Sequence, residues 1–187
     1  MMKRILLAIL LFLSTLAQAA DVSWVKLPDT VYLGSHDLVL NGAGVRSKFF
    51  LDLYIAALYL TERKSSTEAV LADSGEKRIA LHLLRDISAD NLFSAFNKAL
   101  TANHTPAELA SLDGSIKQFG AIFIAMNEVK KGDVITLDYQ ASRGTQVSVN
   151  GVLKGTIAGA AFNTALLKIW LGDKPAQEDL KLKLLGR

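Results

Sequence analysis

The chain contains, in succession, LNGAGVR at residues 40–46 and FFLDLYIAALYL at residues 49–60. In the second stretch apolar residues predominate at both odd and even positions, and alternate residues of a strand point to opposite faces. The stretch therefore predicts a strand that is covered on both faces. A helix is the competing interpretation, but the aromatic content and a predicted glycine-rich bend at residues 41–44 favour the strand.

Further strand and helix patterns lie in blocks on either side of this run. Strands are predicted at residues 23–27, 30–33, 37–40, 77–84, 134–139, 146–149 and 152–154. Helices are predicted at residues 66–71, 88–101, 105–126, with a break at Gly114, 160–171 and 176–185. Asn150-Gly151 between the last two strands is the strongest short hairpin signal. Grouped strands and helices of this kind predict an α+β fold, with an antiparallel sheet and helices packed on one face.

The first 19 residues have the pattern of a secretory signal peptide. Lys3 and Arg4 precede an apolar run at residues 5–13, and Ala17-Gln18-Ala19 has the small-x-small pattern of a cleavage site. The run is too short to span a bilayer, which takes about 20 apolar residues. We therefore expect residues 1–19 to be removed and residues 20–187 to form one periplasmic domain. An uncleaved membrane anchor is the alternative.

Composition excludes several kinds of chemistry. The chain has no cysteine, which excludes disulfides, thiolate nucleophiles and Cys-ligated zinc. Its histidines lack metal-ligand spacing, so we expect no metal and no other cofactor. Without Lys3 and Arg4, 19 of the 21 basic residues remain against 18 acidic ones, so charge gives no reason to expect nucleic-acid binding. No segment after residue 19 reads as a transmembrane helix.

Arg46 is the candidate binding residue that the pattern alone identifies. It follows the glycine-rich bend and precedes the most apolar strand, and its guanidinium offers a planar fork that suits carboxylates. Beside an apolar pocket it would hold the head group of an anion while the pocket takes the tail. The alternative is a structural arginine at a strand end, either exposed or paired with Asp52 or Asp86.

Two parts of the chain resemble the chalcone isomerase superfamily, in particular its bacterial secreted branch. Residues 40–46 followed by LYIAALYL at 53–60 resemble the N-terminal signature of the superfamily. The C-terminal helices are similar at Phe162, Leu166, IWLG (169–172), Pro175 and Leu180-Lys181. The resemblance extends from about Trp24 to Gly186 and implies an open-faced β-sandwich, in which a ligand cleft lies between a large antiparallel sheet and a helical layer.

For an isomerase, the resemblance implies that Arg46 is the catalytic arginine that holds or polarises the substrate during an intramolecular oxa-Michael ring closure. Threonines that assist this reaction are replaced here by Tyr54 and Ile169. Asn97 and Asn103 are only nearby candidates for the asparagine of the isomerase site. These departures disfavour isomerase activity.

For the fatty-acid-binding members, the resemblance implies that an arginine and a tyrosine hold the carboxylate, and Arg46 and Tyr54 match these roles. The expected partner is a small amphiphilic ligand, a fatty acid or a similar apolar carboxylate. The even spacing of the two residues places them on one face only if the strand is continuous. The alternatives are an isomerase and a non-catalytic structural or partner-binding protein.

Overall fold

The computed structural model describes residues 20–22 and 25–187, and side chains from Val25 onward. The predicted signal peptide, residues 1–19, lies outside the described residues, as do residues 23 and 24 of the first predicted strand.

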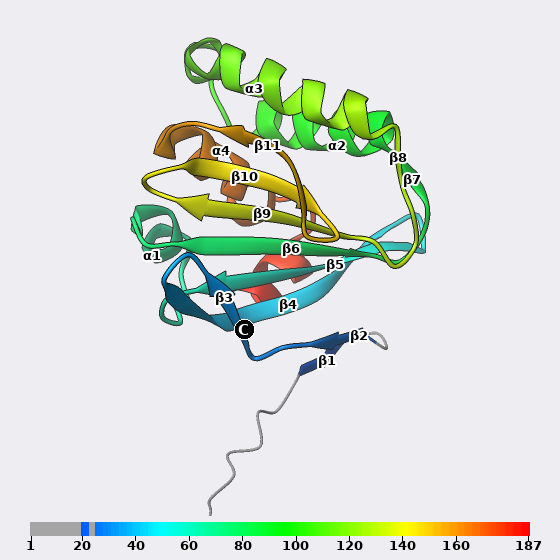
Figure 1. Ribbon diagram of the computed structural model, residues 1–187, viewed down its shortest axis with the longest axis vertical. Coiled ribbons are helices and arrows are strands. Elements are labelled where there is room, and N and C mark those ends of the chain that lie inside the picture. Colours follow the sequence, from blue (N-terminus) through cyan, green and yellow to red (C-terminus); the bar gives the residue numbers. More distant parts are fainter. Residues whose placement is uncertain (1–19, 23–24) are drawn as a thin grey trace, which may run out of the picture.

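A seven-stranded antiparallel sheet forms the centre of the fold, in the order β11-β10-β9-β6-β5-β4-β3 (Figure 1). Its strands in chain order are β3 (Thr30–Leu33), β4 (His36–Lys48), β5 (Leu51–Leu60), β6 (Lys77–Leu83), β9 (Val134–Gln140), β10 (Gly144–Val149) and β11 (Val152–Ile157). Two short antiparallel pairs are formed by β1 (Ala20–Val22) with β2 (Val25–Leu27) and by β7 (Ile87–Ser88) with β8 (Glu128–Val129).

Helices cover one face of this sheet. They are α1 (Thr67–Ala72), α2 (Ala89–Ala102), α3 (Pro106–Met126), α4 (Ala160–Leu171) and α5 (Glu178–Leu184). The α2–α3 pair is inserted between β6 and β9, which are nevertheless neighbours in the sheet. The predicted α+β class, an antiparallel sheet with a helical layer, is confirmed. None of the helices in the described part of the chain has the length and apolar character needed to cross a membrane.

Strand β5 is buried on both faces, as its sequence predicts. On the helix side Tyr54, Ala56 and Leu58 join the main core. On the other face Ile55, Ala57 and Tyr59 pack in a second cluster. That cluster is completed by leucines from the N-terminal strands, namely Leu27, Leu33, Leu38 and Leu40. The central strand is therefore the element on which both halves of the core depend.

The predicted bend at residues 41–44 is wrong, because these residues lie inside the 13-residue strand β4. Leu40 lies opposite Tyr59, and Gly42 lies opposite the next paired residue of β5, Leu58. Two steps along β4 therefore correspond to one step along β5, so β4 has a bulge at Asn41. The glycines do not form a bend; they allow α5 to pack closely against β4. A Cβ on Gly42 would lie 2.0 Å from the Lys183 carbonyl oxygen, which shows how closely the end of α5 approaches β4.

Two further predictions need correction. The predicted strand at residues 49–60 begins at Leu51, because Phe49 and Phe50 have φ angles of 50° and 64° and form the turn of the β4–β5 hairpin. The predicted break at Gly114 is absent, because α3 continues through it to Met126. The Asn150-Gly151 hairpin and the capping box of α3, made by Thr105 and Glu108, form as their sequences indicate.

We predict opposite effects of adding a methyl group at two glycines. Gly42→Ala should lower the free energy of unfolding by about 1–3 kcal/mol, because the new Cβ collides with the backbone of α5. Gly114→Ala should raise the same quantity by about 0.5–1 kcal/mol, because this exposed helical glycine has open space around it. Urea unfolding of both variants measures the effects, and a stabilised Gly42→Ala protein would contradict the close packing of α5 on β4.

Candidate functional site

A cavity of about 900 Å³ lies between the β4–β5 end of the sheet and the helical layer. Its walls come from β4 and β5, from residues 85–88, from one side of α2, and from Ile169 and residues 174–176 around the end of α4. Small-molecule sites typically have volumes of about 300–1,000 Å³, so the cavity is large enough for a ligand with a long chain. Several lining residues are exposed, among them Lys48, Asn91 and Lys98, so the cavity opens to the surface on that side.

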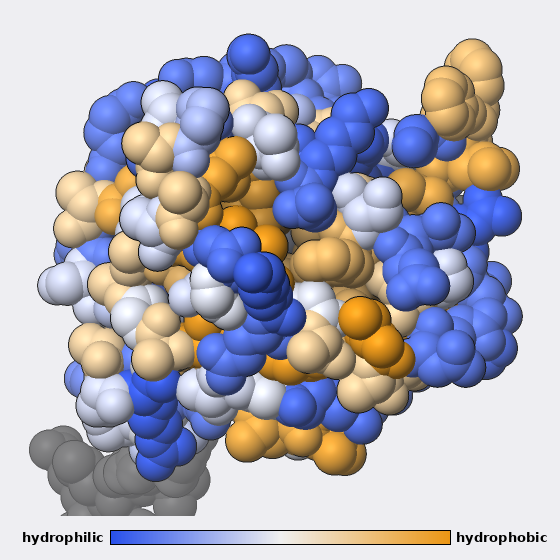
Figure 2. Space-filling model, turned by 90° about the horizontal axis from the view of Figure 1, so that it is seen from above, coloured by the Kyte–Doolittle hydropathy of each residue, from blue (hydrophilic) through white to orange (hydrophobic). Residues whose placement is uncertain are grey.

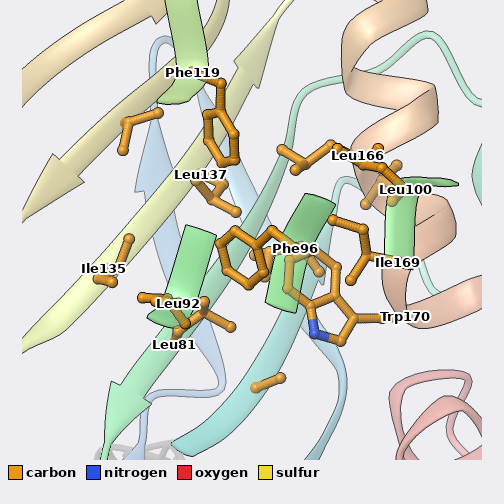
Figure 3. Packing of buried hydrophobic residues seen from close by; sticks show 14 of the residues in the cluster. Leu81, Leu92, Phe96, Leu100, Phe119, Ile135, Leu137, Leu166, Ile169 and Trp170 are labelled. Carbon is orange, nitrogen blue, oxygen red and sulfur yellow. The ribbon is translucent and has the colours of Figure 1, made fainter. Parts of the chain in front are cut away.

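The floor of the cavity is part of the main core. Phe96 of α2 and Ile169 of α4 line it and are almost fully buried. Trp170 lies beside Phe96 in an edge-to-face arrangement, with 5.7 Å between the ring centroids (Figure 3). Because Trp170 is completely buried, its indole N–H needs a partner inside the protein.

That partner is Tyr54, whose hydroxyl oxygen accepts a hydrogen bond from the Trp170 Nε1 at 3.2 Å. Within the described residues no acceptor takes the proton of the Tyr54 hydroxyl. Burial raises the pKa of Tyr54 above its ordinary value of 10.0, against the smaller opposite effects of the Trp170 hydrogen bond and the Arg46 charge. The phenol is therefore neutral at physiological pH, and it lines the cavity with a proton that it can donate to a ligand.

Arg46 lines the same cavity and is half-buried. Its Nη1 donates to the carbonyl oxygen of Ser47 and, at 3.1 Å, to the Oε1 of Gln177. The amide of Gln177 also accepts from the Ser47 N–H at 3.0 Å, so the start of α5 fixes this arginine against β4. In the described chain Nε and Nη2 have no protein acceptor, which leaves one side of the guanidinium fork for an anion.

The paired-arginine alternative receives no support from the contacts of the two carboxylates concerned. Asp52 accepts from the Ser47 hydroxyl at 2.6 Å. Asp86 accepts from the Lys131 backbone N–H at 2.8 Å and lies 3.7 Å from the Lys130 ammonium. No ion pair between Arg46 and an acidic group occurs in the part of the chain that the structure describes.

The hairpin register brings Arg46 and Tyr54 to one face. They are directly opposite each other in the β4–β5 pairing, and opposed residues of antiparallel strands point to the same side of a sheet. Their even spacing predicts a shared face only for a strand that runs unbroken through both residues. The chain instead turns between them at Phe49 and Phe50, and the two residues lie opposite each other across the hairpin.

The rim of the cavity is rich in cations. Lys48, Arg85, Lys98 and Lys174 line it together with Arg46, against a single carboxylate, Asp86. These residues come from four separate segments of the chain, so no local sequence pattern predicts that they meet. The site consequently has a positive entrance above an apolar floor.

The structure places the other candidate residues as follows. Ile169 lines the cavity, but Asn97 and Asn103 do not, and Asn91 lies there instead. The Asn103 amide donates to the carbonyl oxygens of Ala99 and Lys174, so it joins the end of α2 to the loop after α4. Among the residues that the structure describes, no cluster of His, Asp and Glu is suited to hold a metal ion.

Sequence reasoning missed Trp170 and Gln177 as contacts of the site. The contact of Trp170 with Tyr54 spans 116 positions of the chain. Gln177 lies 131 positions after Arg46. A buried tryptophan usually needs a hydrogen-bond acceptor for its indole N–H. Which acceptor Trp170 finds depends on how α4 packs on β5.

Comparison with known proteins identifies relatives of this fold. Residues 19–186 match the family model described as chalcone isomerase-like. The crystal structure of a fatty-acid binding protein from Arabidopsis thaliana is similar, with a TM-score of 0.66, 14% sequence identity, and coverage of 86% of this chain and 91% of that chain. At this identity the likeness shows a common fold. No curated protein has a significantly similar sequence.

We predict that Tyr54 makes the protein less stable at alkaline pH. Its pKa is higher in the folded chain than in the unfolded chain, so above a pH of about 10 the unfolded chain has lost a proton that the folded chain keeps. The free energy of unfolding then falls as pH rises, by at most about 1.4 kcal/mol per pH unit for this group, and its contribution is fully present below that range.

Urea unfolding from about pH 9 to about pH 11 should show a shallower decline for Tyr54→Phe than for the wild type. The substitution also leaves the Trp170 N–H without its acceptor, which lowers stability equally at every pH. Identical slopes for the two proteins would contradict the raised pKa of Tyr54.

Proposed function

Because this chain belongs to the chalcone isomerase-like family, we propose that it binds a fatty acid or a similar apolar carboxylate in the cavity between sheet and helices. The observation that carries the proposal is the pairing of Arg46 with Tyr54 at the boundary between the cationic rim and the apolar floor. The fatty-acid binding protein of similar fold supports the same class of ligand.

The head group of such a ligand is recognised by complementary hydrogen bonds. The two carboxylate oxygens face the free side of the Arg46 guanidinium. The Tyr54 hydroxyl donates a hydrogen bond to the same carboxylate. Hydrogen bonds to a charged group contribute about 1.5–3 kcal/mol each. Gln177 has a positioning role, because its Oε1 accepts from both Arg46 and the Ser47 N–H.

The tail of the ligand is held by the apolar side chains of the cavity. Leu53, Leu92, Phe96, Ala99 and Ile169 supply this surface from three different elements. Burial of each methylene contributes about 0.8 kcal/mol, so affinity should increase with chain length until the cavity is filled.

A chalcone-type isomerase is the competing function, and the position of Arg46 in the cavity favours it. The chemistry around the arginine does not. Tyr54 and Ile169 line the cavity where the resemblance implies threonines, and Ile169 has no polar group to stabilise an enolate. The carboxylate ligand uses both polar groups of the site and is the better match.

We predict that Arg46→Leu weakens binding of a long-chain fatty acid by about 10- to 100-fold, because one charge-assisted hydrogen-bonding group is lost. Binding of the methyl ester of the same acid, which lacks the charge, should change little. Displacement of a fluorescent fatty acid measures both affinities, and native mass spectrometry of protein purified from cells reveals a co-purifying lipid.

Arg63→Leu is the matched control, since this exposed arginine does not line the cavity. Equal losses for acid and ester would indicate damage to the cavity and not loss of a carboxylate contact. Turnover of naringenin chalcone above background, abolished by Arg46→Leu, would instead assign the isomerase. If neither activity is found, the proposed ligand site is refuted.

We also propose that the domain functions in the periplasm, on the basis of the signal-peptide pattern at residues 1–19. The protein from a periplasmic extract should have Ala20 at its N-terminus by mass spectrometry. Ala19→Arg removes the small residue before the cleavage position and should cause the precursor to accumulate. Wild-type protein that keeps Met1 in the membrane or cytosolic fraction would contradict this location.

A further inference from the structure

Two hairpin turns of the sheet have the same backbone form but opposite kinds of residue. In each, two residues separate a flanking pair, Lys48 with Leu51 in one hairpin and Val149 with Val152 in the other. Asn150 and Gly151 have φ angles of 51° and 77°, and Phe49 and Phe50 have 50° and 64°. Asn-Gly suits such a turn, whereas a bulky residue at positive φ is strained. The phenylalanines are therefore not explained by the turn.

They are not explained by the core either. Phe49 is 82% exposed and Phe50 is fully exposed, and the neighbouring Leu51 is 51% exposed. The turn of the β4–β5 hairpin lies at one end of these strands (Figure 1), and Figure 2 shows a group of apolar side chains that projects from one corner of the molecule beside hydrophilic ones. We call Phe49, Phe50 and Leu51 the aromatic tip.

One cation lies beside this tip, and further cations line the cavity that the tip borders. Lys48 lies within 5.4 Å of the Phe49 ring centroid, and Lys48 and Leu51 line the cavity. Arg85, Lys98 and Lys174 line the same cavity. The nearby carboxylates, Asp52 and Asp86, already accept hydrogen bonds from Ser47 and Lys131. A surface that combines projecting aromatic rings with unpaired positive charge is complementary to an anionic lipid layer.

We propose that the aromatic tip docks on the surface of an anionic phospholipid bilayer. Phe49 and Phe50 enter the interfacial region, the surrounding cations contact lipid phosphates, and the open side of the cavity faces the membrane. A second copy of this chain fits the surface less well, because its own cations would meet the same cations. The proposal does not depend on the identity of the ligand in the cavity.

The decisive variant is Phe49→Asn/Phe50→Gly, which gives the tip the residues found in the other hairpin. Its unfolding temperature should rise, because Asn-Gly relieves the strain at positive φ. Its partitioning onto vesicles of phosphatidylglycerol and phosphatidylethanolamine in equal parts should fall at least about tenfold, because both aromatic rings are gone. A higher unfolding temperature together with weaker vesicle binding shows that the two phenylalanines serve docking and not folding.

Vesicle co-sedimentation is measured for the wild type and the variants in the form that the cell produces. All of them then have the same N-terminus, so any contribution of residues 1–19 to vesicle binding is equal in each protein. Wild-type binding should weaken with added salt and on neutral phosphatidylcholine vesicles. Tyr32→Ser is the matched control, because Tyr32 is 67% exposed and lies on β3 at the opposite end of β4 from the tip. This control should bind vesicles like the wild type.

The Asn-Gly variant should keep fatty-acid affinity in solution, because Phe49 and Phe50 do not line the cavity. Vesicle binding can therefore fail while fatty-acid binding persists, and failure of either proposal is distinguishable from failure of the other. The docking proposal is overturned if the wild type does not sediment with anionic vesicles, or if the Asn-Gly variant sediments as well as the wild type. It is also overturned if the wild type is a dimer in solution that the Asn-Gly variant converts to a monomer, because the tip would then be a contact between copies.

Discussion

The bulge at Asn41 determines which side chains of β4 reach the helical layer. Before it, Leu38 and Leu40 face the second cluster, away from the helices. After it, Gly42 and Arg46 lie opposite Leu58 and Tyr54, which face the main core and the cavity. A one-residue change of register reverses the two faces of a strand. Without the bulge, Arg46 would point to the wrong side of the sheet, and no binding site would form beside Tyr54.

The bulge is fixed by hydrogen bonds to distant parts of the chain. The Asn41 amide donates to the carbonyl oxygens of Lys64 and Leu184, and its oxygen accepts from the Lys64 N–H. The same end of α5 lies against Gly42, and its beginning holds Arg46 through Gln177. The C-terminal helix therefore sets both the register of β4 and the direction of its arginine. The site and the register of the sheet therefore depend on the same contacts.

The sequence was informative wherever a signal is local. The apolar run of β5 and the Asn150-Gly151 turn depend on neighbouring residues, and each predicted its element. The predicted bend at residues 41–44 is wrong because glycines in a sequence look the same whether they form a turn or allow another element to pack closely, and the element that packs here is α5. Trp170 and Gln177 were missed because their contacts join segments that are far apart in sequence.

The position of α2 and α3 between two paired strands separates the helical wall of the cavity from the two polar residues on the sheet, Arg46 and Tyr54. Strands β6 and β9 pair directly, and the two-residue ladder of β7 with β8 closes the base of the helical excursion. Insertions or deletions within that excursion leave the sheet register unchanged, so the helical wall can be lengthened, shortened or replaced while Arg46 and Tyr54 stay where they are. The size of the cavity is thus an exchangeable property of this architecture, and the position of Arg46 and Tyr54 is a fixed one.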